Sequence, residues 1–159
     1  HLIDQVIFLF GSPDSYSGET YTQRQGSSID DAFFIQMNYG KLRVRLKNSL
    51  LVVEPGPKYE IHGTAGSFHK SGLDVQEDHL KLGMTPMQTE YGIEPSSDFG
   101  DLTTTLNGIH LNAKVTTETG NWQLLYLNLA DAIRKGNPLI IKEEEILSQM
   151  EILEKIKNN

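Results

Sequence analysis

The chain has 159 residues and a formal charge of −7, and 38% of its residues are apolar and 22% charged. This length fits one domain that buries a core of its own, and the composition is typical of globular rather than disordered chains. The excess of acidic residues disfavours general binding to nucleic-acid backbones. Since the chain has no cysteine, disulfides and thiolate chemistry are excluded.

The sequence shows no sign of membrane insertion or export. No apolar run approaches the roughly 18 residues that a membrane helix needs, and the first residues lack a secretory signal pattern. We therefore expect no membrane partner and a cytoplasmic location. The chain begins at His1 rather than at Met, already inside an amphipathic pattern, so we expect it to be a piece of a longer protein.

Helices are expected at both ends of the chain. Apolar side chains recur at three- and four-residue spacing over residues 1–10, and Gly11 and Pro13 favour an end there. The same spacing predicts helices over residues 122–135 and 143–156. We expect the inner face of the last helix to consist of Ile146, Met150, Leu153 and Ile156.

The middle of the chain alternates with period two and predicts β-strands. Residues 33–39 and 41–47 are separated only at Gly40 and should form an antiparallel hairpin, which residues 49–53 are expected to extend. Other predicted elements are strands at 15–24, 58–62, 67–70 and 110–115, a short helix at 74–82 and an ordered loop at 83–100. The class is α+β, with an open, mainly antiparallel sheet covered on one face by the two C-terminal helices.

A basic row follows one predicted strand and has two interpretations. It is a candidate for nucleic-acid contact, or a polar sheet face whose partners are acids such as Glu54 and Glu60. The net charge favours the second interpretation, so we expect no nucleic-acid partner. The row consists of Lys41, Arg43, Arg45 and Lys47.

The uncovered face of this sheet is a candidate interface. Two helices cover only one face, and the other face combines aromatic and arginine side chains, a mixture typical of protein interfaces. We expect this open face to pair with a second copy of the chain, giving a homo-oligomer. Its residues include Phe34, Gln36, Arg43 and Arg45.

No motif for nucleotide, hydrolase or metal chemistry is evident. Residues 63–67 (GTAGS) lack the lysine of a phosphate loop and open no helix, so we interpret them as a hairpin turn. No serine lies in a Gly-x-Ser-x-Gly motif. The histidines lack the helical His-x-x-x-His or Glu-x-x-His spacing of metal sites, so we expect no metal ligands. We expect exposed or hydrogen-bonded imidazoles at His62, His69, His79 and His110.

Several short stretches, taken in order, resemble the Gfo/Idh/MocA oxidoreductase family, which includes glucose-fructose oxidoreductase and inositol dehydrogenase. The resemblance covers nearly the whole chain and is strongest to a bacterial branch that contains scyllo-inositol dehydrogenases. The stretches are residues 1–5 (HLIDQ), 61–68 (IHGTAGSF) with Lys70, 72–77 (GLDVQE), 91–95 (YGIEP) and 126–139 (YLNLADAIRKGNPL).

The resemblance implies that residues 1–159 are a single C-terminal domain of the dihydrodipicolinate reductase/glyceraldehyde-3-phosphate dehydrogenase type. In that family such a domain binds substrate and pairs subunits, and a separate Rossmann domain, absent from this chain, binds the cofactor. The parent enzyme would use NAD or NADP to interconvert a sugar or cyclitol hydroxyl and its ketone. The resemblance assigns no cofactor-binding residue to this chain, which alone should be inactive and bind no cofactor.

His1 is the catalytic candidate that the resemblance supplies. It falls on the histidine of the family's Asp-x-x-x-His pattern, which moves the proton of the substrate hydroxyl, and imidazole suits that role near neutral pH. Two alternatives remain open. His1 is a helix-start or tag residue without a role, or the parent is a non-enzymatic dimerisation or regulatory module with a degenerate site.

Overall fold

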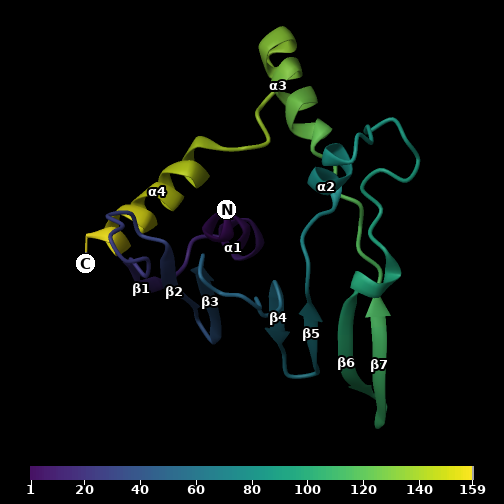
Figure 1. Cartoon of the computed structure of the whole chain (residues 1–159), viewed down its shortest axis with the longest axis horizontal. Helices are drawn as coiled ribbons and strands as arrows, with labels where there is room; N and C mark the ends of the chain where they lie inside the picture. The colour runs from purple at the N-terminus through teal and green to yellow at the C-terminus, as the bar shows by residue number, and fades with distance from the viewer. Residues whose placement is uncertain (159) are drawn as a thin grey trace. The chain divides into compact units, whose positions relative to one another are not determined.

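The computed structural model describes residues 1–158, which form two compact units (Figure 1). One unit comprises His1–Val53 and the chain from Asn128 onward, and the other comprises Glu54–Leu127. Helices and antiparallel strands occur in both, and the sheets are open, which confirms the α+β class. No helix among residues 1–158 is both long and apolar enough to cross a membrane.

The first unit contains a three-stranded antiparallel sheet. Its strands β1 (Ser15–Tyr21), β2 (Ala32–Tyr39) and β3 (Leu42–Ser49) lie in this order, and Tyr39 pairs with Leu42 across the turn at Gly40. The predicted hairpin is therefore confirmed. The predicted extension over residues 49–53 is wrong, because β3 ends at Ser49, which pairs with Ala32 at the start of β2.

The core of this unit lies between the sheet and two helices, α1 (Leu2–Phe10) and α4 (Glu143–Lys157). Ile35 and Met37 of β2 point into it and are 1% and 0% exposed. Successive strand residues alternate between faces, so Phe34 and Gln36 lie on the opposite, uncovered face. The core cluster consists of Ile3, Val6, Ile7, Ile35, Met37, Leu46, Ile152 and Ile156.

The structure corrects two expectations about the C-terminal helices. Of the predicted inner face of α4, Ile156 is buried as expected, whereas Ile146, Met150 and Leu153 are exposed, and the second buried residue is Ile152. The face of Ile152 and Ile156 continues toward the helix start as Gln149 and Glu145, so the spacing of apolar residues alone did not single it out. The other helix, α3 (Gln123–Lys135), has no buried residue, so α1 and α4 rather than α3 and α4 cover the sheet.

The second unit contains a four-stranded antiparallel sheet in the order β4-β5-β6-β7. Strands β4 (Tyr59–His62), β5 (Gly66–Lys70) and β7 (Ile109–Val115) match predictions, and the helix α2 (Gln76–Lys81) lies within predicted residues 74–82. Strand β6 (Gly100–Leu106) was not predicted. It pairs with both β5 and β7, and a short 3-10 helix η1 (Ser96–Asp98) precedes it.

The register gives this second sheet two different faces. Glu60 pairs with His69, and His69 pairs with Asp101, so these three side chains share one face. That face is polar throughout, whereas the opposite face is mainly apolar. The polar face carries Glu60, His62, Ser67, His69, Asp101, Thr103, Asn112 and Lys114. The opposite face carries Ile61, Phe68, Leu102, Leu111 and Ala113.

Candidate functional site

His1 lies at the start of α1. Its carbonyl oxygen accepts the first helical hydrogen bond from Gln5 N at 3.0 Å, while its side chain is exposed and caps no helix N–H group. On the first turn, Asp4 Oδ1 accepts a hydrogen bond from Gln149 Nε2 of α4 at 2.7 Å. The imidazole is therefore open to solvent at the end of a helix that is anchored to its neighbour.

Two of the family-like stretches, the one with Lys70 and the one with Glu94, meet in the second unit around a buried ion pair. Lys70 Nζ lies 2.6 Å from Oε1 and 2.8 Å from Oε2 of Glu94 and donates to the Asp98 carbonyl at 2.9 Å. The hydroxyl of Thr117 donates to the same Glu94 carboxylate. These contacts tie the end of β5 to the loop that precedes β6.

A second set of polar contacts surrounds α2. Gln76 is 2% exposed, and its side-chain amide donates to Asp74 Oδ2 at 2.7 Å, while Asp74 Oδ1 accepts from Gln76 N at 2.9 Å. His79 Nδ1 accepts a hydrogen bond from Gly92 N at 3.0 Å. The Gly92 contact thus holds the long loop against α2 and the Asp74 contacts fix the start of that helix, which gives both a structural role.

Sequence reasoning missed these contacts, although Lys70, Gln76 and Glu94 stand inside the family-like stretches. The signal was a lysine and a glutamate in separate stretches, but their pairing depends on the path of the intervening loop. His79 is hydrogen-bonded as predicted. His62 is also hydrogen-bonded, and His110 is exposed.

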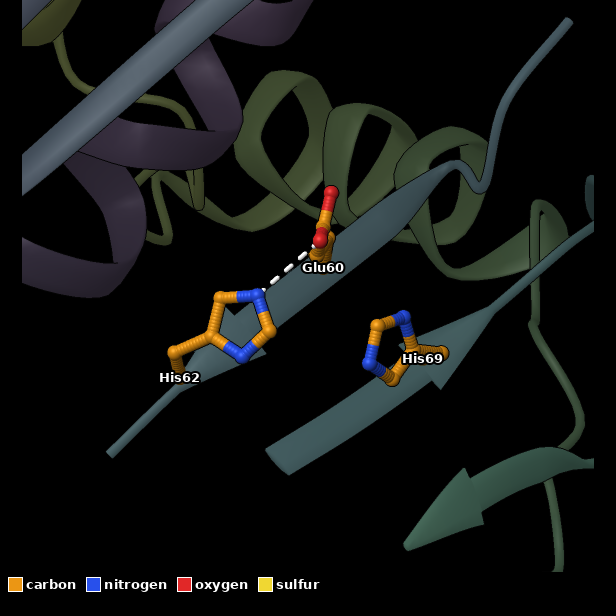
Figure 2. Close-up of side chains that lie close together, drawn as sticks. All are labelled: Glu60, His62 and His69. Atoms are coloured by element: carbon orange, nitrogen blue, oxygen red, sulfur yellow. Dashed lines mark hydrogen bonds and ion pairs between the residues drawn. The ribbon is translucent and has the colours of Figure 1, made fainter. Parts of the chain in front are cut away.

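The polar face of the second sheet brings Glu60, His62 and His69 together (Figure 2). Each offers a ligand atom, and these atoms lie within 4.8 Å of one another. His62 Nε2 lies 2.9 Å from Glu60 Oε1, and His62 Nδ1 lies 2.8 Å from the Ser67 hydroxyl. The rings of His62 and His69 meet edge to face with centroids 5.4 Å apart.

Beside His69 lies an open pocket of about 340 Å³. It lies between the polar face of the sheet, the turn that follows β5, and η1 with the start of β6. Lys114 crosses it, donating to the carbonyl of Phe99 at 3.2 Å and pairing with Asp101 at 2.9 Å. The pocket is lined by His69, Ser71, Gly72, Ser97, Asp98, Phe99, Asp101 and Lys114.

The basic row on β3 lies on the uncovered face of the first sheet. Arg43 donates through Nη1 to the carbonyls of Gly40 and Leu42, at 2.5 and 2.9 Å. Glu60, one of its expected acidic partners, belongs to β4 of the other sheet and bonds His62. Arg43 is therefore hydrogen-bonded to the backbone of its own turn, a contact that stabilises the fold and needs no ligand.

Over residues 1–158 the chain matches the oxidoreductase family Gfo/Idh/MocA, in the family's C-terminal alpha/beta domain. The chain therefore belongs to this family, as the short stretches predicted. Its fold agrees with solved members. It aligns with YvaA from Bacillus subtilis at a TM-score of 0.91 and 33% identity, covering 98% of this chain and 46% of that one.

Relatives of the chain include a dehydrogenase with a named substrate and an uncharacterised oxidoreductase. The scyllo-inositol 2-dehydrogenase (NADP(+)) IolW of Bacillus subtilis is 33% identical over 97% of this chain and 43% of IolW. The uncharacterized oxidoreductase YhhX of Escherichia coli is 34% identical over 98% of this chain and 45% of YhhX. The chain thus spans less than half of the length of these relatives.

Proposed function

We propose that the chain is the C-terminal, substrate-binding and oligomerising domain of a cytoplasmic NAD(P)-dependent oxidoreductase that interconverts a sugar or cyclitol hydroxyl and its ketone. The observation that carries this proposal is the family match across residues 1–158. The similarity to a scyllo-inositol dehydrogenase supports a polyhydroxylated substrate. Since the chain spans less than half of such relatives, the activity belongs to the longer protein.

The cofactor is assigned to another part of that protein. A dinucleotide-binding fold needs parallel β-α-β units with a glycine-rich turn at a helix N-terminus, whereas every strand pair found among residues 1–158 is antiparallel. The described residues therefore do not fit NAD(P). The hydride chemistry belongs to the cofactor in such enzymes, which leaves the substrate side to this chain.

We assign the proton of the substrate hydroxyl to His1. An imidazole nitrogen within hydrogen-bond reach of the hydroxyl accepts the proton during oxidation and returns it during reduction. The exposed position of His1 at the start of α1 supports this role, because the side chain caps no helix N–H group. Acid/base catalysis of this kind contributes about 10²–10⁴-fold to turnover.

We further propose that the uncovered face of the sheet β1-β2-β3 pairs two copies of the chain. Phe34 of β2 lies on that face, between Glu19 of β1 and Lys47 of β3 in register, and is half-exposed. An aromatic side chain flanked by charges of opposite sign suits a self-complementary interface.

The experiment is an assay of the full-length protein with NAD⁺ and NADP⁺ against scyllo-inositol and a panel of sugars. Cofactor reduction with at least one of these polyols is expected. The isolated 159-residue chain should show neither turnover nor NADPH binding by calorimetry. A full-length protein that binds NADPH yet oxidises no polyol would favour the regulatory module, and tight NADPH binding by the isolated chain would refute the division of labour.

A further inference from the structure

We propose that Glu60, His62 and His69 form a binding site for one divalent transition-metal ion of the zinc class on the polar face of the β4-β5 hairpin. The inference is independent of the oxidoreductase assignment, because it depends only on side chains of the second unit. It rests on the strand geometry, the distances within the cluster and the hydrogen bond behind His62.

The strands place the three side chains on one face. Glu60 and His62 are two residues apart on β4, so both point to the same side of the sheet. His69 of β5 is directly opposite Glu60 in the antiparallel register. One strand thus supplies two ligands and its neighbour the third, and the turn at residues 63–65 keeps the register fixed.

The distances suit a small ion with nitrogen and oxygen ligands. Zinc binds imidazole nitrogen and carboxylate oxygen at about 2.0–2.2 Å, which puts tetrahedral ligand atoms about 3.4 Å apart. Here the candidate atoms lie within 4.8 Å of one another, and His62 Nε2 is 2.9 Å from Glu60 Oε1. Small side-chain rotations therefore centre an ion among them, where it replaces the hydrogen bond between His62 and Glu60.

Ser67 supplies the outer support that metal-binding histidines usually have. Its hydroxyl lies 2.8 Å from His62 Nδ1. An ion bound at Nε2 replaces the hydrogen bond to Glu60 and leaves the ring proton on Nδ1, which then donates to the Ser67 hydroxyl and fixes the ring.

Charge and access also favour a cation. Histidine binds a metal in its neutral form, so the metal-binding ligand set carries the one negative charge of the carboxylate. The next acid on this face, Asp101, pairs with Lys114 at 2.9 Å. Glu60 and His62 are exposed, so an ion enters directly from solvent. Three protein ligands leave a coordination position for water, and the pocket beside His69 borders the site.

The test is titration of the tag-free 159-residue chain with ZnCl₂ by calorimetry and with CoCl₂ by visible absorption. About one ion per chain should bind, and bound Co²⁺ should give the intense visible bands of a low-coordinate site. Metal affinity should fall at least about tenfold in each of the three ligand variants, His62→Ala, His69→Ala and Glu60→Gln. Loss of an outer-shell partner alone already lowers metal affinity about tenfold. Ser67→Ala removes the outer-shell partner of His62 and should lower metal affinity about tenfold.

Two controls isolate the cluster from other histidines. His110→Ala removes an exposed imidazole of β7 and should leave the affinity unchanged. His1→Ala removes chelation by the terminal amine and imidazole, and should also leave it unchanged. Circular dichroism of each variant confirms folding, and in the wild-type chain Co²⁺ should broaden the NMR signals of His62 and His69 but not those of His110.

Each outcome either supports or overturns the proposed metal site. Zinc binding that is weakened by all three ligand substitutions and kept in both controls supports the site. Absence of binding, or binding that is unchanged in His62→Ala and His69→Ala, overturns it. Broadening confined to His1 in the NMR experiment would likewise overturn it, even if a ligand variant failed to fold.

Discussion

Lys70 and Glu94 form a buried ion pair in which Nζ reaches both carboxylate oxygens, at 2.6 and 2.8 Å. Their side chains are 14% and 6% exposed. The pair joins the end of β5 to a loop residue 24 positions later in the chain. The long loop before β6 is thus held by a charge contact.

Removing the cation of this pair should destabilise the second unit strongly. Lys70→Met leaves the Glu94 carboxylate buried without its counter-charge, which typically costs about 3–5 kcal/mol. Urea unfolding followed by the fluorescence of Trp122, the single tryptophan, measures the loss.

Two further variants test the cause of that loss. Lys70→Met combined with Glu94→Gln should recover part of the stability, because no charge then remains buried. Lys81→Met breaks only exposed ion pairs with Glu77 and Asp78 and should cost at most about 1 kcal/mol. Equal losses in Lys70→Met and Lys81→Met would contradict the importance of burial.

Asp31 should make the stability of the first unit depend on pH. Hydrogen bonds from the backbone N–H of Gln23 and the side chain of Arg24 hold the pKa of Asp31 below its ordinary value. A lowered pKa stabilises the folded state above about pH 4, and this contribution disappears as the pH falls through the lowered pKa.

Asp31→Asn should therefore destabilise the chain at pH 7, and its difference from wild type should shrink as the pH falls below about 4. Thermal unfolding across that pH range measures it. Asp30→Asn removes the charge of the exposed neighbouring residue and serves as the control, with a smaller effect expected at pH 7. A difference for Asp31→Asn that stays constant from pH 7 to acid would argue against the lowered pKa.

Gly92 has a left-handed backbone and no room for a side chain. Its φ is +77°, and a Cβ atom there would lie 2.9 Å from Thr119 Cγ2 and 3.3 Å from Gln76 Cγ. Gly108 has a similar φ of +79° but open space around it. Gly108→Ala should cost about 1–2 kcal/mol from backbone strain alone, and Gly92→Ala should cost more. Urea unfolding compares them, and similar costs would show that Thr119 and Gln76 yield easily.

The proposed pairing of sheet faces predicts a monomeric variant. Phe34→Glu introduces a charge on the uncovered face of β2, where it would meet its copy, so this variant should be monomeric while the wild-type chain is dimeric at high micromolar concentration. Light scattering measures both masses. Leu50→Glu, in the exposed turn after β3, should remain dimeric. A monomeric wild-type chain would refute the interface.

Elements were predicted correctly where apolar and polar residues alternate clearly. They were predicted poorly where tertiary packing decides which residues are buried. Strand β6 escaped prediction because Thr103, Thr104 and Thr105 give both faces the same polarity. The same limit applies to α4, where apolar spacing favoured the face of Ile146, Met150 and Leu153, although the buried residues are Ile152 and Ile156.

The site was predicted only where a resemblance supplied it. His1 was singled out by its place in a family pattern, whereas the contact of Lys70 with Glu94 depends on a loop path that no local rule specifies. The cluster of Glu60, His62 and His69 was within reach of sequence reasoning. Its signal is Glu-x-His on a strand and a histidine after a tight turn, whereas the expectation of no metal ligands rested on helical spacing.

The proposed acid/base role of His1 is tested most directly by the steady-state rate of cofactor reduction by the full-length protein, with and without the imidazole of His1. His1→Ala should lower kcat by about 10²–10⁴-fold, while the protein stays folded and still binds NADPH. That result would place the substrate proton on this residue and the catalytic site partly on this chain. A His1→Ala protein that turns over at the wild-type rate would contradict this catalytic role of His1.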